Sequence, residues 1–295
     1  MASAIMNDDA PSDVTTFVEP TESHTHTVIF LHGREDFGSD LAQYFFDSKS
    51  SDNKSIAELF PSVKFVFPTS ALRFCARRDL EFSTSTFAES LKGEEIISQW
   101  FDVWDLDSPL EKQDLMIPGI RESTVQILDI VQEEAKSVPL NRIILGGISQ
   151  GCATAILTLL SSGMAIGGFI GLCSWLPLEN IIDEFPSSCV GNRSEISRHI
   201  QKSLVLVSDK QPQIDDINTI ISRLSLDTKL DIPIFLSHSR DDDTVQFSQG
   251  EGLRQGMEKL GFDVTWKEYE DGGHWIHSKY GVDDIANFIN TIWKF

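Results

Sequence analysis

Residues 141–161, which read NRIILGGISQGCATAILTLLS, decide the fold. Arg142–Leu145 contains the apolar run Ile143-Ile144-Leu145, with two β-branched residues, and predicts a strand, whereas Cys152–Leu160 is built from small and apolar residues and predicts a helix. Between them stands Gly147-Ile148-Ser149-Gln150-Gly151. A serine on a sharp turn from strand to helix, with a glycine two residues away on either side, is the arrangement that exposes a nucleophile.

The turn explains why these residue types occur together. It forces Ser149 into a strained backbone conformation that exposes its oxygen, and Gly147 and Gly151 leave room for the crossing backbone. The helix that follows points its N-terminus at the serine, where partial positive charge favours a developing oxyanion. A tight structural turn is the alternative interpretation, but the strand and helix on either side favour a nucleophile.

Similar strand and helix patterns recur along the chain. Further predicted strands are Val28–Leu31, Val63–Phe67, Gly168–Leu172, Ile232–Ser237 and Val264–Tyr269. Apolar residues at helical spacing lie between or after them, at Thr124, Leu128, Val131 and Ala135 and at Ile285, Phe288, Ile289 and Ile292. Because the strands are almost continuously apolar, we predict an α/β fold with a mostly parallel central sheet and helices on both faces.

The 295 residues could form one large domain or two small ones, and we predict one. It spans residues 26–295 and follows a polar N-terminal tail, residues 1–25. Two stretches exceed a minimal α/β alternation, at about 69–119, rich in aromatic and charged residues, and at about 179–230, rich in Ser and Asp. We predict that both are insertions, because loops of this length are often lids or binding loops.

Composition excludes several kinds of partner. With 24 basic and 45 acidic residues, the formal charge of −21 repels nucleic acid and anionic membrane surfaces. Apolar stretches are too short to cross a bilayer, and Met1–Val14 lacks the basic and apolar regions of a secretory signal, so we expect a cytoplasmic protein. The four cysteines lack the spacing of a zinc site or a disulfide framework, and we expect reduced thiols and no metal site.

A serine nucleophile needs a base that is oriented by a third group. Enzymes with this type of turn place the acid and then the histidine after the serine in the chain. His274 lies in a glycine-containing loop, residues 271–275, directly after the predicted strand that ends at Tyr269. We predict that His274 is the base, with His277 as the alternative, expected at the surface or rim of the site.

The acid should follow the predicted strand Ile232–Ser237, where the chain carries Asp241, Asp242 and Asp243. Position alone leaves all three open. Two of them should belong to a solvated turn that also begins the next helix.

An oxyanion site requires two backbone N–H donors. We assign them to Arg34, in the loop after the strand Val28–Leu31, and to Gln150, directly after the nucleophile. Gly33 lets this loop approach the substrate closely, and each donor contributes on the order of 3 kcal/mol. His32 is expected to be structural.

Five motifs in this order point to a known family. They are Leu31-His32-Gly33, Trp100-Phe101-Asp102, the segment from Asn141 to Gly151, the segment from Ser174 to Leu178, and Gly273-His274. Together they resemble the acyl-protein thioesterase group, also described as the phospholipase/carboxylesterase family of α/β-hydrolases. The resemblance spans about Thr27 to Phe295 and is closest to fungal members, judging by Pro118 to Ser123.

This resemblance implies an α/β-hydrolase fold and an intracellular serine hydrolase that cleaves acyl esters or thioesters through an acyl-enzyme, without a cofactor. The implied substrates are fatty-acyl thioesters on protein cysteines, lysophospholipids or small carboxylic esters. The family pattern places the acid in an Asp-x-x-Val context shortly after a strand-end histidine. Here Asp242 and Val245 follow His238, which nominates Asp242 as the acid, with Asp241 and Asp243 as solvated neighbours.

The sequence departs from the family at three places. The segment 34–37 replaces a glycine-rich stretch, Cys152 stands where glycine is common, and both insertions look longer than usual. These changes should reshape the acyl-binding side. Candidate substrate-binding residues are Leu72, Phe74, Phe82, Phe87, Trp100, Trp104 and Trp175. Any one of these could instead be ordinary core.

Two other functions compete with hydrolysis. An acyltransferase or chain-release enzyme would pass the acyl group from Ser149 to an acceptor other than water. A hydrolase fold can also serve as a binding protein without catalysis. Survival of the nucleophile, base and acid in this sequence argues against binding alone.

Overall fold

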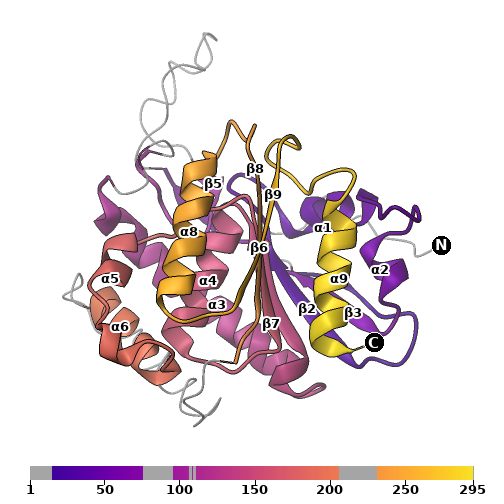
Figure 1. Ribbon diagram of the computed structural model, residues 1–295, viewed down its shortest axis with the longest axis horizontal. Helices are drawn as coiled ribbons and strands as arrows, with labels where there is room; N and C mark the ends of the chain where they lie inside the picture. The colour runs from indigo at the N-terminus through magenta and orange to yellow at the C-terminus, as the bar shows by residue number, and fades with distance from the viewer. Residues whose placement is uncertain (1–14, 76–95, 106–107, 109–110, 206–230, 295) are drawn as a thin grey trace.

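The computed structural model describes residues 15–75, 96–105, 108, 111–205 and 231–294 (Figure 1). Within these ranges the main sheet has seven strands in the order β1-β3-β2-β6-β7-β8-β9. Their bounds are Thr16–Val18 (β1), His26–Leu31 (β2), Val63–Phe67 (β3), Ile143–Ile148 (β6), Gly168–Leu172 (β7), Ile234–Ser239 (β8) and Val264–Tyr269 (β9). Only β1 runs antiparallel to its neighbour in this sheet, so the predicted mostly parallel α/β fold is confirmed.

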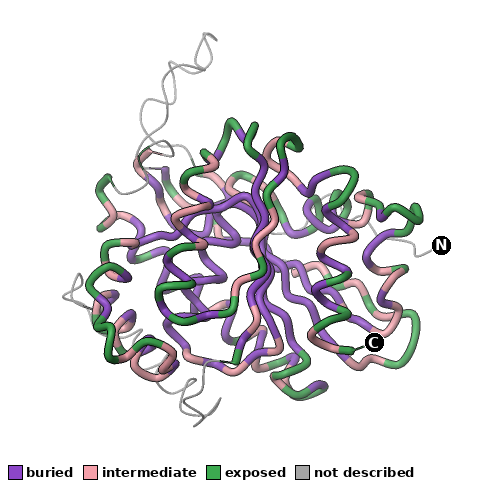
Figure 2. Tube along the Cα trace, viewed as in Figure 1, coloured by how far each residue is buried: buried purple, intermediate pink, exposed green. Residues whose placement is uncertain are grey.

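Strands β2, β6, β7 and β8 are buried along their whole length. In the middle of the sheet Val28 of β2 pairs with Phe65 of β3 on one side and with Ile144 of β6 on the other. Burial on both faces is why these strands read as unbroken apolar runs in the sequence. Figure 2 shows the buried strands at the centre of the molecule.

Helices cover both faces of the sheet (Figure 1). The bounds on one side are Met116–Glu134 (α3), Gln150–Ser162 (α4) and Phe247–Lys259 (α8), and on the other Gly38–Asp47 (α1), Ile56–Leu59 (α2) and Gly281–Trp293 (α9). Each layer has its own apolar core, and successive residues of β6 belong to different cores, Ile144 to that of α1 and α9 and Leu145 to that of α3 and α4. The alternation follows from the pleat of a strand, which points neighbouring side chains to opposite faces.

The predicted N-terminal tail is too long. Thr16–Val18 pairs with residues 65–67 of β3, and the N–H groups of Glu22 and Thr25 donate to the carbonyl oxygens of Pro61 and Ser62. Backbone hydrogen bonds hold this edge strand while its side chains stay partly exposed, so it lacks the apolar pattern that reveals the central strands. Residues 1–14 of the predicted tail lie outside the described residues.

The first predicted insertion, about 69–119, contains a small antiparallel pair, Leu72–Phe74 (β4) with Ile96–Ser98 (β5). A short 3-10 helix, Gln113–Leu115, then leads into α3, which begins at Met116 inside the predicted range. Residues 76–95 of this insertion lie outside the description.

The second predicted insertion, about 179–230, begins with α5, Glu179–Asp183, and α6, Arg193–Val205. Ile182 of α5 and Ile196 and Ile200 of α6 are buried in the same core as α4. This part therefore extends the helical layer, and residues 206–230 lie outside the description. Among the helices that the structure describes, none has the length and apolarity needed to cross a membrane.

Candidate active site

Ser149 stands between β6 and α4 in a backbone conformation that non-glycine residues rarely adopt, with φ 54° and ψ −127°. Such conformations cost about 1–3 kcal/mol and persist where the surroundings hold them. Here the Ser149 N–H donates to the Leu172 carbonyl at 2.9 Å, and the Ser174 hydroxyl donates to the Ser149 carbonyl at 2.7 Å. Contacts from the end of β7 thus fix the turn that exposes the serine.

The two flanking glycines are required by close backbone contacts. A Cβ atom at Gly147 would lie 2.6 Å from the carbonyl carbon of Gly151, and one at Gly151 would lie 2.3 Å from the Leu31 carbonyl oxygen. The turn therefore closes on itself and on the end of β2. No larger residue fits without moving this backbone.

Asp242 and His274 meet beside this turn. The Nδ1 atom of His274 lies 2.8 Å from Oδ2 of Asp242, whose side chain is fully buried. The other carboxylate oxygen, Oδ1, accepts the N–H groups of Thr244 and Val245, each at 2.9 Å. The acid is therefore fixed through both oxygens.

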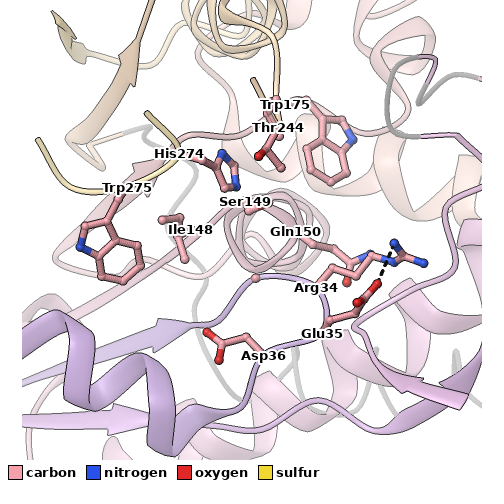
Figure 3. A pocket seen from close by; sticks show the side chains of 12 residues that line it. Arg34, Glu35, Asp36, Ile148, Ser149, Gln150, Trp175, Thr244, His274 and Trp275 are labelled. Atoms are coloured by element: carbon pink, nitrogen blue, oxygen red, sulfur yellow. Dashed lines mark ion pairs between the residues drawn. The ribbon is translucent and has the colours of Figure 1, made fainter. Parts of the chain in front are cut away.

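The surroundings of Asp242 determine its charge. Burial, the largest influence, pushes its pKa upward, but hydrogen bonds from His238, His274 and the Val245 N–H outweigh burial and hold the pKa well below its usual range. An ionised carboxylate only accepts, so Nδ1 of His274 must carry the proton that it donates. The Nε2 atom is left to act as a base, and Figure 3 shows His274 next to Ser149.

Both predicted oxyanion residues lie around Ser149. Gln150 is the first residue of α4, so its N–H has no acceptor within the helix. Arg34 lies in the loop after β2, and this loop approaches so closely that a Cβ on Gly33 would lie 3.5 Å from the Ser149 Cβ. The loop is held by the N–H of Glu35, which donates to the Ser98 carbonyl at 2.7 Å.

Arg34, a residue that departs from the family pattern, directs its charged guanidinium at other residues of this protein. Its guanidinium contacts the Glu35 carboxylate at 3.1 Å, the Gln99 side-chain oxygen at 3.4 Å and the Cys75 sulfur at 2.9 Å. These contacts tie the loop after β2 to the segment of the first insertion that the structure describes.

A pocket of about 360 Å³ opens over the serine. Its lining residues are Gly33, Arg34, Glu35, Asp36, Ile148, Ser149, Gln150, Trp175, Thr244, Val245, His274 and Trp275 (Figure 3). Trp175, a predicted substrate-binding residue, and Trp275, which the prediction did not include, stand on opposite sides of it. Both indoles present apolar surface next to the nucleophile.

The other predicted substrate-binding residues lie elsewhere. Trp100 is fully buried in the core, and its indole N–H donates to the His32 carbonyl at 2.8 Å. Leu72 and Phe74 lie on β4, are 48% and 59% exposed, and are absent from the pocket lining. Trp104 packs under the Lys112 ammonium, whereas Phe82 and Phe87 lie outside the described residues.

His277, the alternative base, is not at the surface as expected. It is buried, stacks on Tyr269 with ring centroids 4.4 Å apart, and donates from Nε2 to Asp271 at 3.1 Å. Its Nδ1 atom accepts the N–H of Tyr280 at 3.1 Å. With both ring nitrogens used by neighbouring groups, His277 shapes the loop that carries His274.

The two neighbours of Asp242 differ from each other. Asp241 accepts the N–H groups of Gly272 at 3.3 Å and Gly273 at 2.9 Å, and so it holds the His274 loop rather than only facing solvent. Asp243 is exposed, and its carboxylate takes a 3.4 Å contact from the Thr244 hydroxyl. Both carboxylates are exposed, as predicted, and Asp241 has these two loop contacts in addition.

Two side chains near the acid were not assigned from the sequence. His238 lies at the end of β8, with Nε2 3.2 Å from Asp242 Oδ2. Cys173 follows β7, and its sulfur lies within 4.8 Å of the ligand atoms of Asp242 and His274. Burial, aided by the Asp242 charge, raises the pKa of this thiol well above its usual value, so it stays protonated and is a poor metal ligand. The family pattern includes the strand-end histidine His238, but the sequence does not show its contact with the acid four residues later. Cys173 meets Asp242 because β7 and β8 are neighbours in the sheet.

Comparison with known proteins shows which family this chain resembles. A family model described as Phospholipase/Carboxylesterase matches residues 84–209, which include the turn around Ser149. The acyl-protein thioesterase 1 of Yarrowia lipolytica is 28% identical over 273 residues, covering 92% of both chains. The predicted resemblance to the phospholipase/carboxylesterase family is therefore confirmed.

Further relatives agree with this assignment. The acyl-protein thioesterase 1 of Debaryomyces hansenii is 26% identical over 284 residues, covering 95% of this chain and 96% of its own. Among solved structures, acyl-protein thioesterase 2 of Zea mays superposes with a TM-score of 0.60 at 20% identity, over 95% of this chain and 98% of that one, which supports the fold. The predicted resemblance to fungal members and the class of enzyme, a serine hydrolase of ester or thioester bonds, are confirmed.

Proposed function

We propose that this protein hydrolyses acyl thioesters on protein cysteines, and related acyl esters, through a Ser149–His274–Asp242 triad. The substrate is suggested by the fungal relatives, which are named acyl-protein thioesterases. The chemistry is supported by one observation above all, the bond of 2.8 Å between a buried, ionised Asp242 and Nδ1 of His274, beside a strained serine.

In the first half-reaction the Ser149 oxygen attacks the acyl carbonyl carbon, and its proton passes to Nε2 of His274. The N–H groups of Arg34 and Gln150 stabilise the oxyanion, and Asp242 stabilises the imidazolium that forms. The C–S bond then breaks, and the imidazolium returns its proton to the departing cysteine sulfur. The products are a free thiol and an ester of Ser149.

In the second half-reaction water replaces the departed thiol. His274 takes a proton from the water as it attacks the acyl carbon, and the same two N–H groups hold the second oxyanion. The ester bond to Ser149 breaks, the serine oxygen regains its proton from His274, and a carboxylic acid leaves. Since the chain's own residues supply every proton transfer, no cofactor enters this proposal.

The acyl-enzyme is tested with a fluorophosphonate probe and with a matched pair of long-acyl substrates, one a thioester and one an oxyester. Ser149→Ala should abolish both labelling and hydrolysis. Equal labelling of the two proteins would refute Ser149 as the nucleophile. If an added alcohol captured most of the acyl group even when dilute, the enzyme would be an acyltransferase instead.

A cytoplasmic location forms part of the proposal. Cys152, Cys173 and Cys189 are thiols outside any disulfide, as expected in a reducing compartment. Fractionation of cells that express the full chain, with probe labelling of each fraction, tests this location.

A further inference from the structure

His238 is buried among the residues that surround the triad acid. It lies on β8, only 1% exposed, and its Nε2 atom is 3.2 Å from Asp242 Oδ2 and 2.8 Å from the Val245 carbonyl oxygen. An ionised carboxylate and a carbonyl oxygen can only accept hydrogen bonds. Nε2 of His238 must therefore carry a proton, which it shares between the two acceptors.

We propose that His238 is a positioning residue that fixes the orientation of the triad acid and draws charge from the same oxygen that holds His274. The inference rests on the proposed function, in which Asp242 orients the catalytic base. His238 acts through Asp242 and does not line the pocket over Ser149.

The Asp242 carboxylate is held through both of its oxygens. Oδ1 of Asp242 is fixed by the N–H groups of Thr244 and Val245, and Oδ2 is shared by His238 and His274. Donors on both oxygens oppose rotation of the carboxylate. Of these four donors, only His274 would remain on Oδ2 if the His238 donor were lost.

The second effect concerns charge. A donor on Oδ2 takes up part of its negative charge and weakens its pull on the His274 proton. Without His238, the carboxylate would stabilise the imidazolium form of His274 more strongly. The base would then stay protonated up to a higher pH.

The His238 ring fits closely against α8, where residue 250 is a glycine. A Cβ atom at Gly250 of α8 would lie 2.2 Å from Nδ1 of His238, and Phe247 packs edge-on against the ring with centroids 5.9 Å apart. Within the described part of the chain, Nδ1 has no hydrogen-bond partner. A buried donor without an acceptor is costly, so Nδ1 is best left unprotonated and the ring neutral.

Other titratable groups around the pair have their own partners. Glu268 on β9 pairs in register with His238, but its carboxylate accepts from Arg240 at 3.0 Å and from the Trp266 indole at 3.3 Å. The Cys173 thiol lies near Asp242 and stays neutral. From α8, Phe247 and Gly250 face the ring.

The test compares His238→Leu, which removes the donor, with His238→Gln, whose side-chain amide can restore it. For His238→Leu we expect kcat to fall about 10-fold to 100-fold with KM changed less than about twofold, the range for losing a hydrogen bond to a charged group. The acid limb of the kcat/KM profile should move to higher pH. His238→Gln should recover most of kcat and return the limb toward its original position.

Phe247→Leu is the matched control, because it loosens packing on the same ring without removing a donor to Asp242. If His238→Leu lowers only the folded fraction, and its active protein keeps both kcat and the acid limb, His238 is structural and the proposal is wrong. Failure of the proposed function would give a different result, because Ser149→Ala would then remain active.

A measurement on the unaltered protein covers the case in which His238→Leu does not fold. The ¹⁵N NMR signals of the His238 ring, assigned by their loss in His238→Gln, should show a neutral ring with its proton on Nε2. A proton on Nδ1 alone would overturn the proposal, because Nε2 could then donate nothing to Asp242.

Discussion

Acid should destabilise this protein through His32, which lies beneath the loop that carries Arg34. His32 is fully buried; its Nδ1–H donates to the Gly33 carbonyl at 2.6 Å, and its Nε2 accepts the Ser70 N–H at 2.9 Å. Both nitrogens are therefore satisfied in the neutral ring. A second ring proton would point at the Ser70 N–H, with no acceptor there.

The magnitude follows from the two pKa values. Burial, the main cause, lowers the pKa of His32 from 6.5 to about 4, against a smaller opposite effect of the Gly33 hydrogen bond. Because the folded pKa lies below the unfolded one, the unfolded chain gains the proton first. Stability is full above pH 6.5 and is lost as the pH falls toward 4. Linkage gives a loss of about 2 kcal/mol at pH 5, with an upper limit of about 3 kcal/mol.

Urea unfolding at several pH values between 5 and 7.5 measures this loss, with His32→Gln as the test variant. Glutamine does not titrate, and its side-chain oxygen can accept the Ser70 N–H. The variant should lose about 2 kcal/mol less than the unaltered protein between pH 7.5 and pH 5. His26, whose pKa burial also lowers to about 4, titrates in both proteins and cancels in this difference.

If His32→Gln keeps the original pH dependence to within about 0.5 kcal/mol, His32 is not the acid-sensitive group and the argument from its two hydrogen bonds fails.

Three further predictions concern the triad and its turn. Asp242→Asn should reduce kcat by about 10⁴ at equal folded fraction, whereas Asp243→Asn should change kcat/KM less than about tenfold; the reverse ranking would move the acid. Asp241→Ala removes the acceptor for two loop N–H groups and should reduce kcat/KM more than Asp241→Asn, which keeps one side-chain oxygen. Equal losses of kcat/KM in steady-state kinetics would contradict this role of Asp241. Gly151→Ala should lower the free energy of unfolding, measured with urea, by at least about 3 kcal/mol. Gly252→Ala, where the nearest atom lies 3.5 Å from the added carbon, should lower it by under about 1 kcal/mol. Similar losses in the two variants would refute the steric argument.

The sequence predicted those parts of the fold that are buried on both faces. The six predicted strands all occur, with ends within two or three residues, and α9 carries Ile285, Phe288 and Ile289 into the core as its spacing indicated. The edge strand Thr16–Val18 was missed because backbone pairing, not apolar side chains, holds it. Helices α5 and α6 were taken for an insertion because their polar outer faces masked a few buried isoleucines.

Of the predicted substrate-binding residues that the structure describes, Trp175 lines the pocket, and the others do not. Aromatic content identified a segment, but not which aromatic side chains would face the serine. Trp175 faces the pocket because it follows β7, the strand next to the nucleophile, whereas Trp100 is drawn into the core by its bond to the His32 carbonyl. Position relative to a strand end was therefore a better guide than residue type.

The roles of the three aspartates in the acidic turn after β8 depend on the three-dimensional structure and cannot be assigned from their sequence positions. Sequence position alone does not distinguish the three consecutive carboxylates. In the structure the turn gives each a different environment: Asp241 accepts the Gly272 and Gly273 N–H groups, Asp242 pairs with His274, and Asp243 faces solvent. The first aspartate therefore holds the backbone of the loop whose imidazole the second one orients. A change at Asp241 should act through the mobility of that loop, whereas a change at Asp242 acts on the tautomer and charge of the base itself. Both would lower turnover, but only the second should alter how turnover depends on pH.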